Sequence, residues 1–294
     1  MIKPRFSKKL LVTFFCILAI AALAGFIFIS QQKKFVRSLE KNISGIAEHQ
    51  QGEFACVIKD MRFPYTQWDK NEKELFPAAS LMKVPVLAVV FKAVDEGKLS
   101  LDEKVVVRRK DIAGGSGIIK AMKMPAAFSL RELLKIMIAS SDNTATNKVI
   151  SLLGYEYLNN GFTELGLKDT VLKRKMMDFS LRDKGVENYT SARDISSLLE
   201  RMYRKELVDE AASGEMISYL KSQKINDRLP RYLPNEVTVA HKTGLERGVV
   251  HDAGIVFSPK GDYIICILTR GVNSYAQAKK FIADTSLVTY NLYQ

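Results

Sequence analysis

The feature that most constrains this chain is a long uncharged stretch near its N-terminus. No charged side chain occurs between Leu10 and Gln32, and residues 10–29 (LLVTFFCILAIAALAGFIFI) are almost wholly apolar. Twenty such residues in a helix rise about 30 Å, which matches the hydrocarbon core of a bilayer. The sequence therefore predicts one transmembrane helix over residues 10–32.

The orientation of this helix depends on its surroundings. Four basic residues precede the stretch and three follow it, an asymmetry too small to determine the orientation. A short head, residues 1–9, favours a cytoplasmic N-terminus. The alternative is a cleaved signal peptide, because Ala22-Leu23-Ala24 resembles a cleavage site. Since the apolar run continues to Ile29, we expect an uncleaved single-pass anchor in the cell membrane, with the domain on the extracytoplasmic side.

The positive charge of the chain is concentrated next to this stretch. The net charge is +12, of which residues 1–37 contribute +7 without any acid, so the remainder carries only +5. No arginine-rich run and no basic patch interleaved with aromatic residues is present. We therefore expect a bilayer as a partner through residues 10–32, and no nucleic acid.

Cysteine and histidine are scarce, with three of each in the chain. No Cys-x-x-Cys pair and no Cys/His spacing typical of metal ligands occurs, so we expect no metal and no cofactor. Cys16 lies in the apolar stretch, whereas Cys56 and Cys266 lie in short runs typical of strands. These two are expected to be buried apolar residues. The sequence does not decide whether they form a disulfide with each other.

Hydrophobic patterns divide the rest of the chain into a linker helix, residues 33–51, and one domain, residues 52–294. Strands are predicted over 53–60, near 73–76, and over 236–242, 248–257 and 262–270. Helices are predicted over 80–96, 129–153 with a break at 141–143, 190–207 and 274–293. Consecutive strands with short links pair antiparallel, which excludes a doubly wound parallel fold. We expect an α+β domain, with a helical lobe inserted between the first strand and the later ones.

Three short motifs carry the candidate chemistry: Ser80-Leu81-Met82-Lys83, Ser141-Asp142-Asn143 and Lys242-Thr243-Gly244. Each alone is a weak signal, because a serine ahead of an apolar helix is more often an N-cap than a nucleophile. Their order and placement make the combination more specific than any one of them.

The first motif places Lys83 one helical turn after Ser80, on the same face. A serine hydroxyl becomes a good nucleophile only when a neighbour takes its proton. A lysine does so when desolvation or another cation lowers its pKa. The apolar neighbours Met82 and Val84 supply the desolvation, and Lys242 can supply the cation.

The other two motifs provide groups that such a reaction needs. Ser141 lies at a helix break, from which its hydroxyl can relay a proton to a leaving amine. Asn143 can hold a lysine and a substrate amide, and Thr243 can bind a carboxylate. Gly244 removes bulk beside the substrate, and the Leu245 N–H can join a helix N-terminus in an oxyanion hole.

The three motifs in this order are those of class A β-lactamases and penicillin-binding proteins. The chain resembles class A β-lactamase-like serine hydrolases over most of residues 50–294, including Phe76-Pro77-Ala78-Ala79-Ser80 and His251-Asp252-Ala253-Gly254. This resemblance implies a five-stranded antiparallel sheet flanked by helices, with an all-α lobe and the motifs in the cleft between them. It also implies a β-lactam or a D-Ala-D-Ala-type peptide as the substrate; we expect a monomer.

The resemblance assigns a role to each matching residue. Ser80 is the acylated nucleophile, Lys83 its activator and Ser141 the proton relay. Asn143 anchors the substrate and the lysine, and Lys242 and Thr243 form the carboxylate site.

The chain departs from the family where deacylation is concerned. Class A enzymes use the glutamate of an ExxLN segment to activate water, and the corresponding segment here runs from Asp178 to Arg182 (DFSLR). Asp178 is one methylene shorter than glutamate, and a pairing with Arg182 would lower its pKa and weaken it as a base. Asp178 is therefore a catalytic candidate, and the alternative is a surface loop acid.

Three functions remain open at this point. The first is a membrane-anchored β-lactam hydrolase with slow deacylation. The second is a penicillin-binding-type DD-carboxypeptidase or transpeptidase acting on peptidoglycan. The third, a non-catalytic β-lactam-binding sensor, is disfavoured because only nine residues precede the predicted span.

Overall fold

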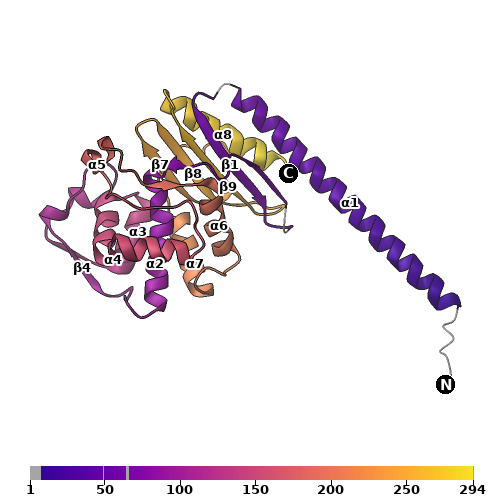
Figure 1. The fold of residues 1–294 in the computed structure, drawn as a ribbon, viewed down its shortest axis with the longest axis horizontal. Helices are drawn as coiled ribbons and strands as arrows, with labels where there is room; N and C mark the ends of the chain where they lie inside the picture. The colour runs from indigo at the N-terminus through magenta and orange to yellow at the C-terminus, as the bar shows by residue number, and fades with distance from the viewer. Residues whose placement is uncertain (1–7, 49, 64–65, 294) are drawn as a thin grey trace, which may run out of the picture.

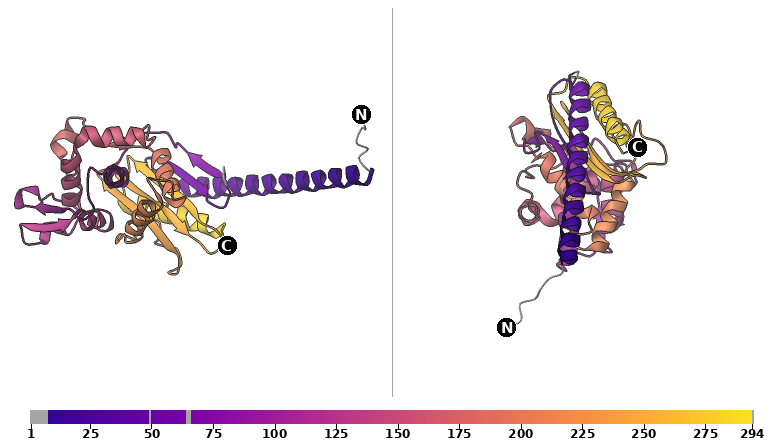
Figure 2. Two further views of the ribbon diagram at one scale, coloured as in Figure 1. Left: turned by 90° about the horizontal axis from the view of Figure 1, so that it is seen from below. Right: turned by 90° about the vertical axis from the view of Figure 1, so that its right-hand side faces the viewer.

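The computed structural model describes residues 8–48, 50–63 and 66–293. A long N-terminal helix projects from a domain in which helices cover both faces of one sheet (Figures 1 and 2). The helices are α1 (Lys8–Ala47), α2 (Lys83–Asp95), α3 (Leu130–Ala139), α4 (Asn143–Glu164), α5 (Phe179–Asp183), α6 (Ala192–Tyr203), α7 (Glu210–Lys221) and α8 (Tyr275–Asn291). The strands are β1 (Glu53–Asp60), β2 (Gln67–Lys70), β3 (Phe76–Pro77), β4 (Lys104–Val107), β5 (Ala126–Ser129), β6 (Tyr189–Thr190), β7 (Thr238–Glu246), β8 (Val249–Phe257) and β9 (Tyr263–Arg270).

The main sheet has five antiparallel strands in the order β2-β1-β9-β8-β7. The last three strands along the chain are joined by short turns, as the sequence predicts, and β1 pairs with β9 across more than 200 residues. The helices α2, α3, α4, α6 and α7 lie between β1 and β7 in sequence and pack together on one side of the sheet (Figure 1). The predicted α+β fold with an inserted helical lobe is confirmed.

Alternating side chains of the sheet fill two separate cores. On β9, Cys266 packs in the core shared with the helical lobe, whereas Ile265 and Ile267 pack in the core beneath α1 and α8. Cys266 pairs with Val57 in register, so the neighbouring Cys56 faces the opposite side of the sheet. All three cysteines are free, and the disulfide that the sequence left open is excluded.

The N-terminal helix is longer than the sequence predicts. The expected span 10–32 and the expected linker helix 33–51 form one unbroken helix, α1, that ends at Ala47. By length and composition, Thr13–Ala47 is able to cross a membrane, a test that a signal sequence also passes. The C-terminal half of α1 packs against the domain, where Leu39 and Ile43 are fully buried.

Three local predictions differ from the structure. The strand expected near 73–76 is wrong: β2 lies earlier, and β3 is a two-residue strand paired with β6. Helix α7 was not predicted from the sequence. The motif Lys242-Thr243-Gly244 lies inside β7 rather than at its end, because β7 continues to Glu246 in a regular ladder with β8.

Candidate active site

Ser80 lies in a 3₁₀ turn (Ala79–Met82) that leads directly into α2. Three residues earlier, the Pro77 carbonyl accepts a hydrogen bond from His251 Nε2 at 2.8 Å, and the Thr269 N–H donates to His251 Nδ1 at 3.0 Å. Burial lowers the pKa of His251 to about 4, so the ring is neutral at pH 7 and carries its proton on Nε2. The strand β8 therefore holds the chain just ahead of Ser80.

Lys83 joins the first motif to the second. Its Nζ lies 3.0 Å from Ser80 Oγ, 3.0 Å from Ser141 Oγ and 2.9 Å from Asn143 Oδ1, and it donates to the Ser141 carbonyl at 2.7 Å. The Lys83 side chain is fully buried. The lysine is thus surrounded by hydrogen-bond partners, and it forms no ion pair with a carboxylate of the described residues.

Lys242 brings in the third motif. Its Nζ donates to Ser141 Oγ at 3.0 Å and to the Thr243 carbonyl at 2.8 Å, and the side chain is fully buried. Ser141 Oγ therefore lies between the Nζ atoms of two lysines, each at 3.0 Å. Residues about 60 and 100 positions apart meet at this single hydroxyl.

Burial and the positive charge of Lys242 hold the pKa of Lys83 well below its usual value, against an opposing effect of Asp142. Burial also lowers the pKa of Lys242 to about 7, an effect that Asp252 opposes and the buried Arg228 reinforces. A lysine with a lowered pKa is uncharged for part of the time at neutral pH. The arrangement can therefore supply a base beside Ser80 Oγ.

The second motif also shapes one wall of the site. The Asp142 carboxylate caps α4 and accepts hydrogen bonds from the Ile118 and Ile119 N–H groups at 2.7 and 2.9 Å. Asn143 Nδ2 donates to the Gly114 carbonyl at 3.0 Å. Both contacts hold the loop 114–119 against the start of α4.

Three non-glycine residues around the site have left-handed backbones: Ala79 (φ 44°), Ser141 (φ 52°) and Met177 (φ 67°). Such conformations are costly for residues with a Cβ and persist only where surrounding contacts impose them. One lies directly before Ser80, one in the second motif and one directly before Asp178.

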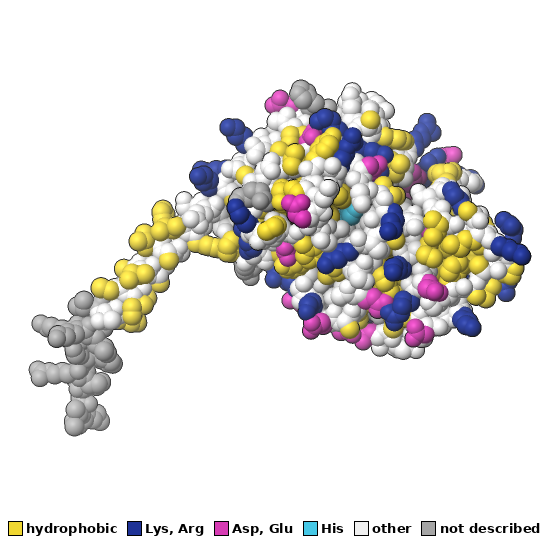
Figure 3. Space-filling view, turned by 180° about the vertical axis from the view of Figure 1, so that it is seen from behind, with side chains coloured by type: hydrophobic (Ala, Val, Ile, Leu, Met, Phe, Trp, Pro, Cys, Tyr) yellow, Lys and Arg dark blue, Asp and Glu magenta, His cyan; other side chains and the backbone are white. Residues whose placement is uncertain are grey.

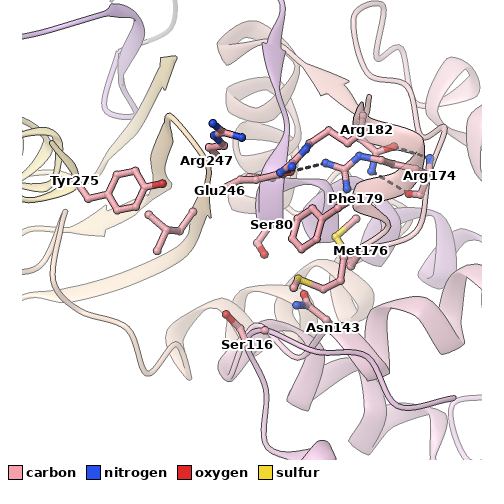
Figure 4. Close-up of a pocket in the computed structure, with 15 residues that line it drawn as sticks. Ser80, Ser116, Asn143, Arg174, Met176, Phe179, Arg182, Glu246, Arg247 and Tyr275 are labelled. Carbon is pink, nitrogen blue, oxygen red and sulfur yellow. Dashed lines mark hydrogen bonds and ion pairs between the residues drawn. The ribbon is translucent and has the colours of Figure 1, made fainter. Parts of the chain in front are cut away.

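A cavity of about 310 Å³ opens beside Ser80 (Figure 4). Of the predicted site residues, Ser80, Asn143 and Leu245 line it, whereas Lys83 and Lys242 lie buried behind Ser80. Its lining consists of Ala79, Ser80, Gly115, Ser116, Asn143, Arg174, Met176, Met177, Phe179, Arg182, Asn188, Leu245, Glu246, Arg247 and Tyr275. In the part of the chain that the structure describes, no group of three or more His, Cys, Asp and Glu side chains is placed to hold a metal ion.

The rest of the third motif is buried within the sheet. Thr243 is buried and is not among the described lining residues. Gly244 packs against β8, where a Cβ would come 3.0 Å from the ring of His251. A larger residue at this position would press on the histidine that holds the Pro77 carbonyl.

Asp178 lies outside this cluster. Its carboxylate accepts the Leu181 N–H at 3.1 Å and so caps the short helix α5, and it is not among the described residues that line the cavity. Arg182 forms ion pairs with Asp183 at 3.0 Å and Glu246 at 3.4 Å, and not with Asp178 as the sequence suggested. The geometry thus favours a structural role for Asp178.

The loop 172–188 presents apolar side chains that the sequence reasoning missed. Met176, Met177 and Phe179 line the cavity, and Figure 4 shows Met176 and Phe179 between Ser80 and the loop. The Asn147 side chain holds Met176, accepting its N–H at 2.7 Å and donating to its carbonyl at 3.0 Å. The only sequence signal was the position of the two methionines just ahead of Asp178.

Charged residues tie this loop to β7. Arg174 is almost fully buried and forms ion pairs with Glu187 at 2.8 Å and with Glu246 at 2.7 Å. Glu246 and the neighbouring Arg247 line the cavity two and three residues beyond Gly244. None of these four residues stood out in the sequence.

Comparison with known proteins places this geometry in a family. The model of the "Beta-lactamase enzyme family" matches residues 38–293. Beta-lactamase VEB-1 of Pseudomonas aeruginosa is 23% identical over 80% of this chain and 86% of its own length. The crystal structure of a beta-lactamase from Sphaerobacter thermophilus superposes with a TM-score of 0.80 at 26% identity, over 87% of this chain and 96% of that one. PBP-A superposes with a TM-score of 0.77 at 30% identity, over 87% and 95%, and a mutant of it is solved as an acyl-enzyme complex with penicillin G.

Proposed function

Because the chain belongs to the beta-lactamase enzyme family, we propose that it opens β-lactam rings through an acyl-enzyme on Ser80. Attack of Ser80 Oγ on the lactam carbonyl forms the ester bond and leads to rupture of the ring C–N bond. The serine proton passes to uncharged Lys83, whose Nζ is 3.0 Å away. The lowered pKa of Lys83 supports this role.

Ser141 is the proposed proton relay to the ring nitrogen. Its hydroxyl lies 3.0 Å from both Lys83 and Lys242, so a proton taken up by Lys83 can pass through Ser141 to the leaving nitrogen. Asn143 holds Lys83 and lines the cavity, where it can also bind a substrate amide. Lys242 and Thr243 are the proposed partners of the substrate carboxylate.

The carbonyl oxygen needs donors as it gains negative charge. Leu245 lies on β7, which is an edge strand of the sheet, so backbone groups on its open side are not paired within the sheet. Its N–H and the N–H of Ser80 are the proposed oxyanion hole. Each such donor is worth about 3–4 kcal/mol in acyl-transfer enzymes.

The proposal of slow deacylation rests on the apolar side chains with which the loop 172–188 forms one wall of the cavity. Met176, Met177 and Phe179 line this wall, and Glu246 is the only carboxylate among the described lining residues. Arg174 and Arg182 bind the Glu246 carboxylate and hold it turned toward their guanidinium groups. Among the described residues that line the cavity, no free carboxylate is thus left to activate water, and we expect the acyl-enzyme to decay slowly.

The same wall favours a second candidate function. A penicillin-binding-type carboxypeptidase or transpeptidase forms its acyl-enzyme from a D-Ala-D-Ala-type peptide, and β-lactams act on it as slow inhibitors. The likeness to PBP-A supports this candidate. The two functions share Ser80 and differ in which acyl donor turns over.

We further propose that α1 anchors the domain outside the membrane. The side chains of Phe14, Phe15 and Phe26 are exposed, which suits a lipid environment and not water. The full-length protein is expected to stay in the membrane pellet after alkaline carbonate washing, with its domain open to protease outside intact cells. A soluble mature chain beginning at Gly25 would instead support a cleaved signal peptide.

Turnover of two substrates tests the function. A chromogenic cephalosporin should give a burst of product equal to the enzyme concentration, followed by a slow steady state, with labelled penicillin attached at Ser80. Release of D-alanine from a D-Ala-D-Ala peptide that outpaces this steady state would select the second candidate. Ser80→Ala is the control and should lose both reactions. Rapid linear hydrolysis without a burst would contradict slow deacylation.

A further inference from the structure

Helix α1 enters the domain without a break in its hydrogen bonding. Its N-terminal half exposes large apolar side chains (Figure 3). Its C-terminal half carries the fully buried Leu39 and Ile43. The projecting half of α1 therefore continues directly from the half that packs against the sheet. The direction of α1 determines which end of the domain faces a membrane.

The end of the domain beside the apolar half of α1 is the turn between β1 and β2. The rings of Phe28 and Phe63 meet edge to face with centroids 5.0 Å apart. One turn later, Thr66 Oγ1 donates to Gln32 Oε1 at 2.6 Å. Phe28 lies at the end of the predicted span, so Phe63 lies at the level where α1 would leave the bilayer.

The turn between β8 and β9 lies at the same end. Arg62 stacks over the ring of Tyr293 at 4.6 Å and donates to the Lys260 carbonyl at 2.9 Å. Asp60 binds the Arg62 guanidinium at 2.6 Å, so the charge of Arg62 is compensated within the domain. An aromatic residue and two turns thus form one face, which we call the juxtamembrane face (Arg62, Phe63, Lys260 and Gly261).

Basic residues lie on α1 close to the level of this face and in the face itself. Lys33, Lys34 and Arg37 lie on α1 just past the apolar half, and Lys260 lies in the β8–β9 turn. None of these four forms an ion pair with any residue of the described ranges. Basic side chains near an apolar residue at this level suit the headgroup region of an anionic bilayer, at about 1 kcal/mol for each.

We propose that the juxtamembrane face docks on the surface of an anionic lipid bilayer, with Phe63 at the boundary between headgroups and acyl chains. The inference rests on the proposed anchoring by α1. Docking also determines how far the cleft lies from the bilayer surface. Strand β9 runs away from the juxtamembrane face for eight residues, about 26 Å at 3.3 Å each. The far end of β9 carries Arg270, which stacks on Phe76 four residues before Ser80. The cleft is then held well above the lipid rather than against it.

Tryptophan fluorescence in vesicles tests the docking. Trp68 is the only tryptophan, so Trp68→Phe gives a full-length protein without tryptophan fluorescence. One tryptophan is then introduced into this variant at a chosen position. The positions are Phe63→Trp on the juxtamembrane face, Phe15→Trp in the span and Leu75→Trp at the cleft end of the sheet. The vesicles contain equal parts phosphatidylcholine and phosphatidylglycerol, with lipids brominated near the headgroup end of the acyl chains as quencher.

Docking requires that Phe63→Trp and Phe15→Trp lose fluorescence as the bromolipid fraction rises, while Leu75→Trp does not. Quenching of Phe15→Trp without Phe63→Trp would overturn the docking and leave the anchoring intact. Absence of quenching at Phe15→Trp would overturn both. Quenching at Leu75→Trp would show that the domain lies flat, contrary to the proposal.

A charge reversal tests the lipid class. In the Phe63→Trp background, Lys260→Glu should reduce the quenching toward the level found in pure phosphatidylcholine vesicles. Lys104→Glu, an exposed lysine on β4 in the distant lobe, is the matched control and should leave the quenching unchanged. Equal quenching in both vesicle types would overturn the role of anionic lipid.

Discussion

The Arg174 guanidinium lies 2.7 Å from the Glu246 carboxylate and so joins the loop 172–188 to the cleft end of β7. The same guanidinium binds Glu187 at 2.8 Å, and Arg182 reaches Glu246 from the loop side at 3.4 Å. The buried Arg174 thus joins two positions of the loop to each other, through Glu187, and the loop to β7, through Glu246. The position of the apolar cavity wall depends on this contact.

Loss of Arg174 should destabilise the protein strongly. Arg174→Ala leaves Glu187 and Glu246 without their buried partner, which costs about 3–5 kcal/mol. The free energy of unfolding is measured by urea titration of the detergent-solubilised chain, with Trp68 fluorescence as the signal. The control is Arg204→Ala, which breaks a surface pair with Glu200 and should cost less than about 1 kcal/mol. Equal losses in the two variants would contradict a structural role for the buried pair.

Acylation should depend on pH through Lys83. The lysine must be uncharged to take the Ser80 proton, so the acylation rate falls as the pH drops below its pKa. Burial and the charge of Lys242 hold the pKa of Lys83 low. Lys242→Met removes this charge and therefore raises the pKa of Lys83, which moves the acid limb of the rate profile to higher pH.

The rate of labelling by a fluorescent penicillin, followed across neutral pH, measures the acid limb. Lys242→Arg keeps a permanent positive charge beside Lys83 and should leave the limb in place or move it to lower pH. A limb that stays in place in Lys242→Met would mean that Lys83 is not the base, or that the two lysines do not interact.

Deacylation should respond to a carboxylate on the loop wall. Met176→Glu puts a carboxyl group into the cavity beside the acyl-enzyme, and we expect decay to accelerate about 100-fold, the lower end of what a positioned base supplies. Asp178→Glu should leave the decay rate within about twofold, because residue 178 caps α5 outside the cavity. The decay of penicillin-labelled protein after excess ligand is removed gives both rates. The opposite order of the two variants would restore Asp178 as the base.

Stability should fall in mild acid because of His251. Its pKa is about 4 in the folded protein and about 6.5 when unfolded, so the unfolded chain binds the extra proton between these values. The stability that depends on neutral His251 is complete above pH 6.5 and is lost as the pH falls toward 4, by about 3 kcal/mol in all. Urea titrations at pH 7 and pH 5 measure the difference.

The matched variant for this prediction is His251→Gln, which carries no proton in either state. Its free energy of unfolding should change less than that of the wild type across the same range. A wild-type stability that stays level between pH 7 and pH 5 would show that the buried ring accepts a proton without cost.

Local patterns in the sequence were sufficient to identify the three motifs and to predict most helices and strands of the fold. The three-residue spacing of Ser80 and Lys83 places them on one helical face, since a helix brings residues three apart together whatever surrounds it. The strands β8 and β9 follow from two apolar runs and a short turn, because a short link allows only antiparallel pairing. The helix predicted over 190–207 is α6, whose N-terminus the Ser191 hydroxyl caps.

The loop opposite Ser80 was decided by tertiary structure alone. The resemblance to the family's ExxLN segment selected Asp178, yet the side chains of Asn147 and Asn188 fix the loop so that Met176 and not Asp178 meets the cavity. The contact of Arg174 with Glu246 spans 72 residues, and no periodicity connects such positions. Spacing along the chain predicts what one helix or hairpin brings together. The direction of an irregular loop depends on which distant groups satisfy its backbone, and these exist only once the sheet and the helical lobe have packed.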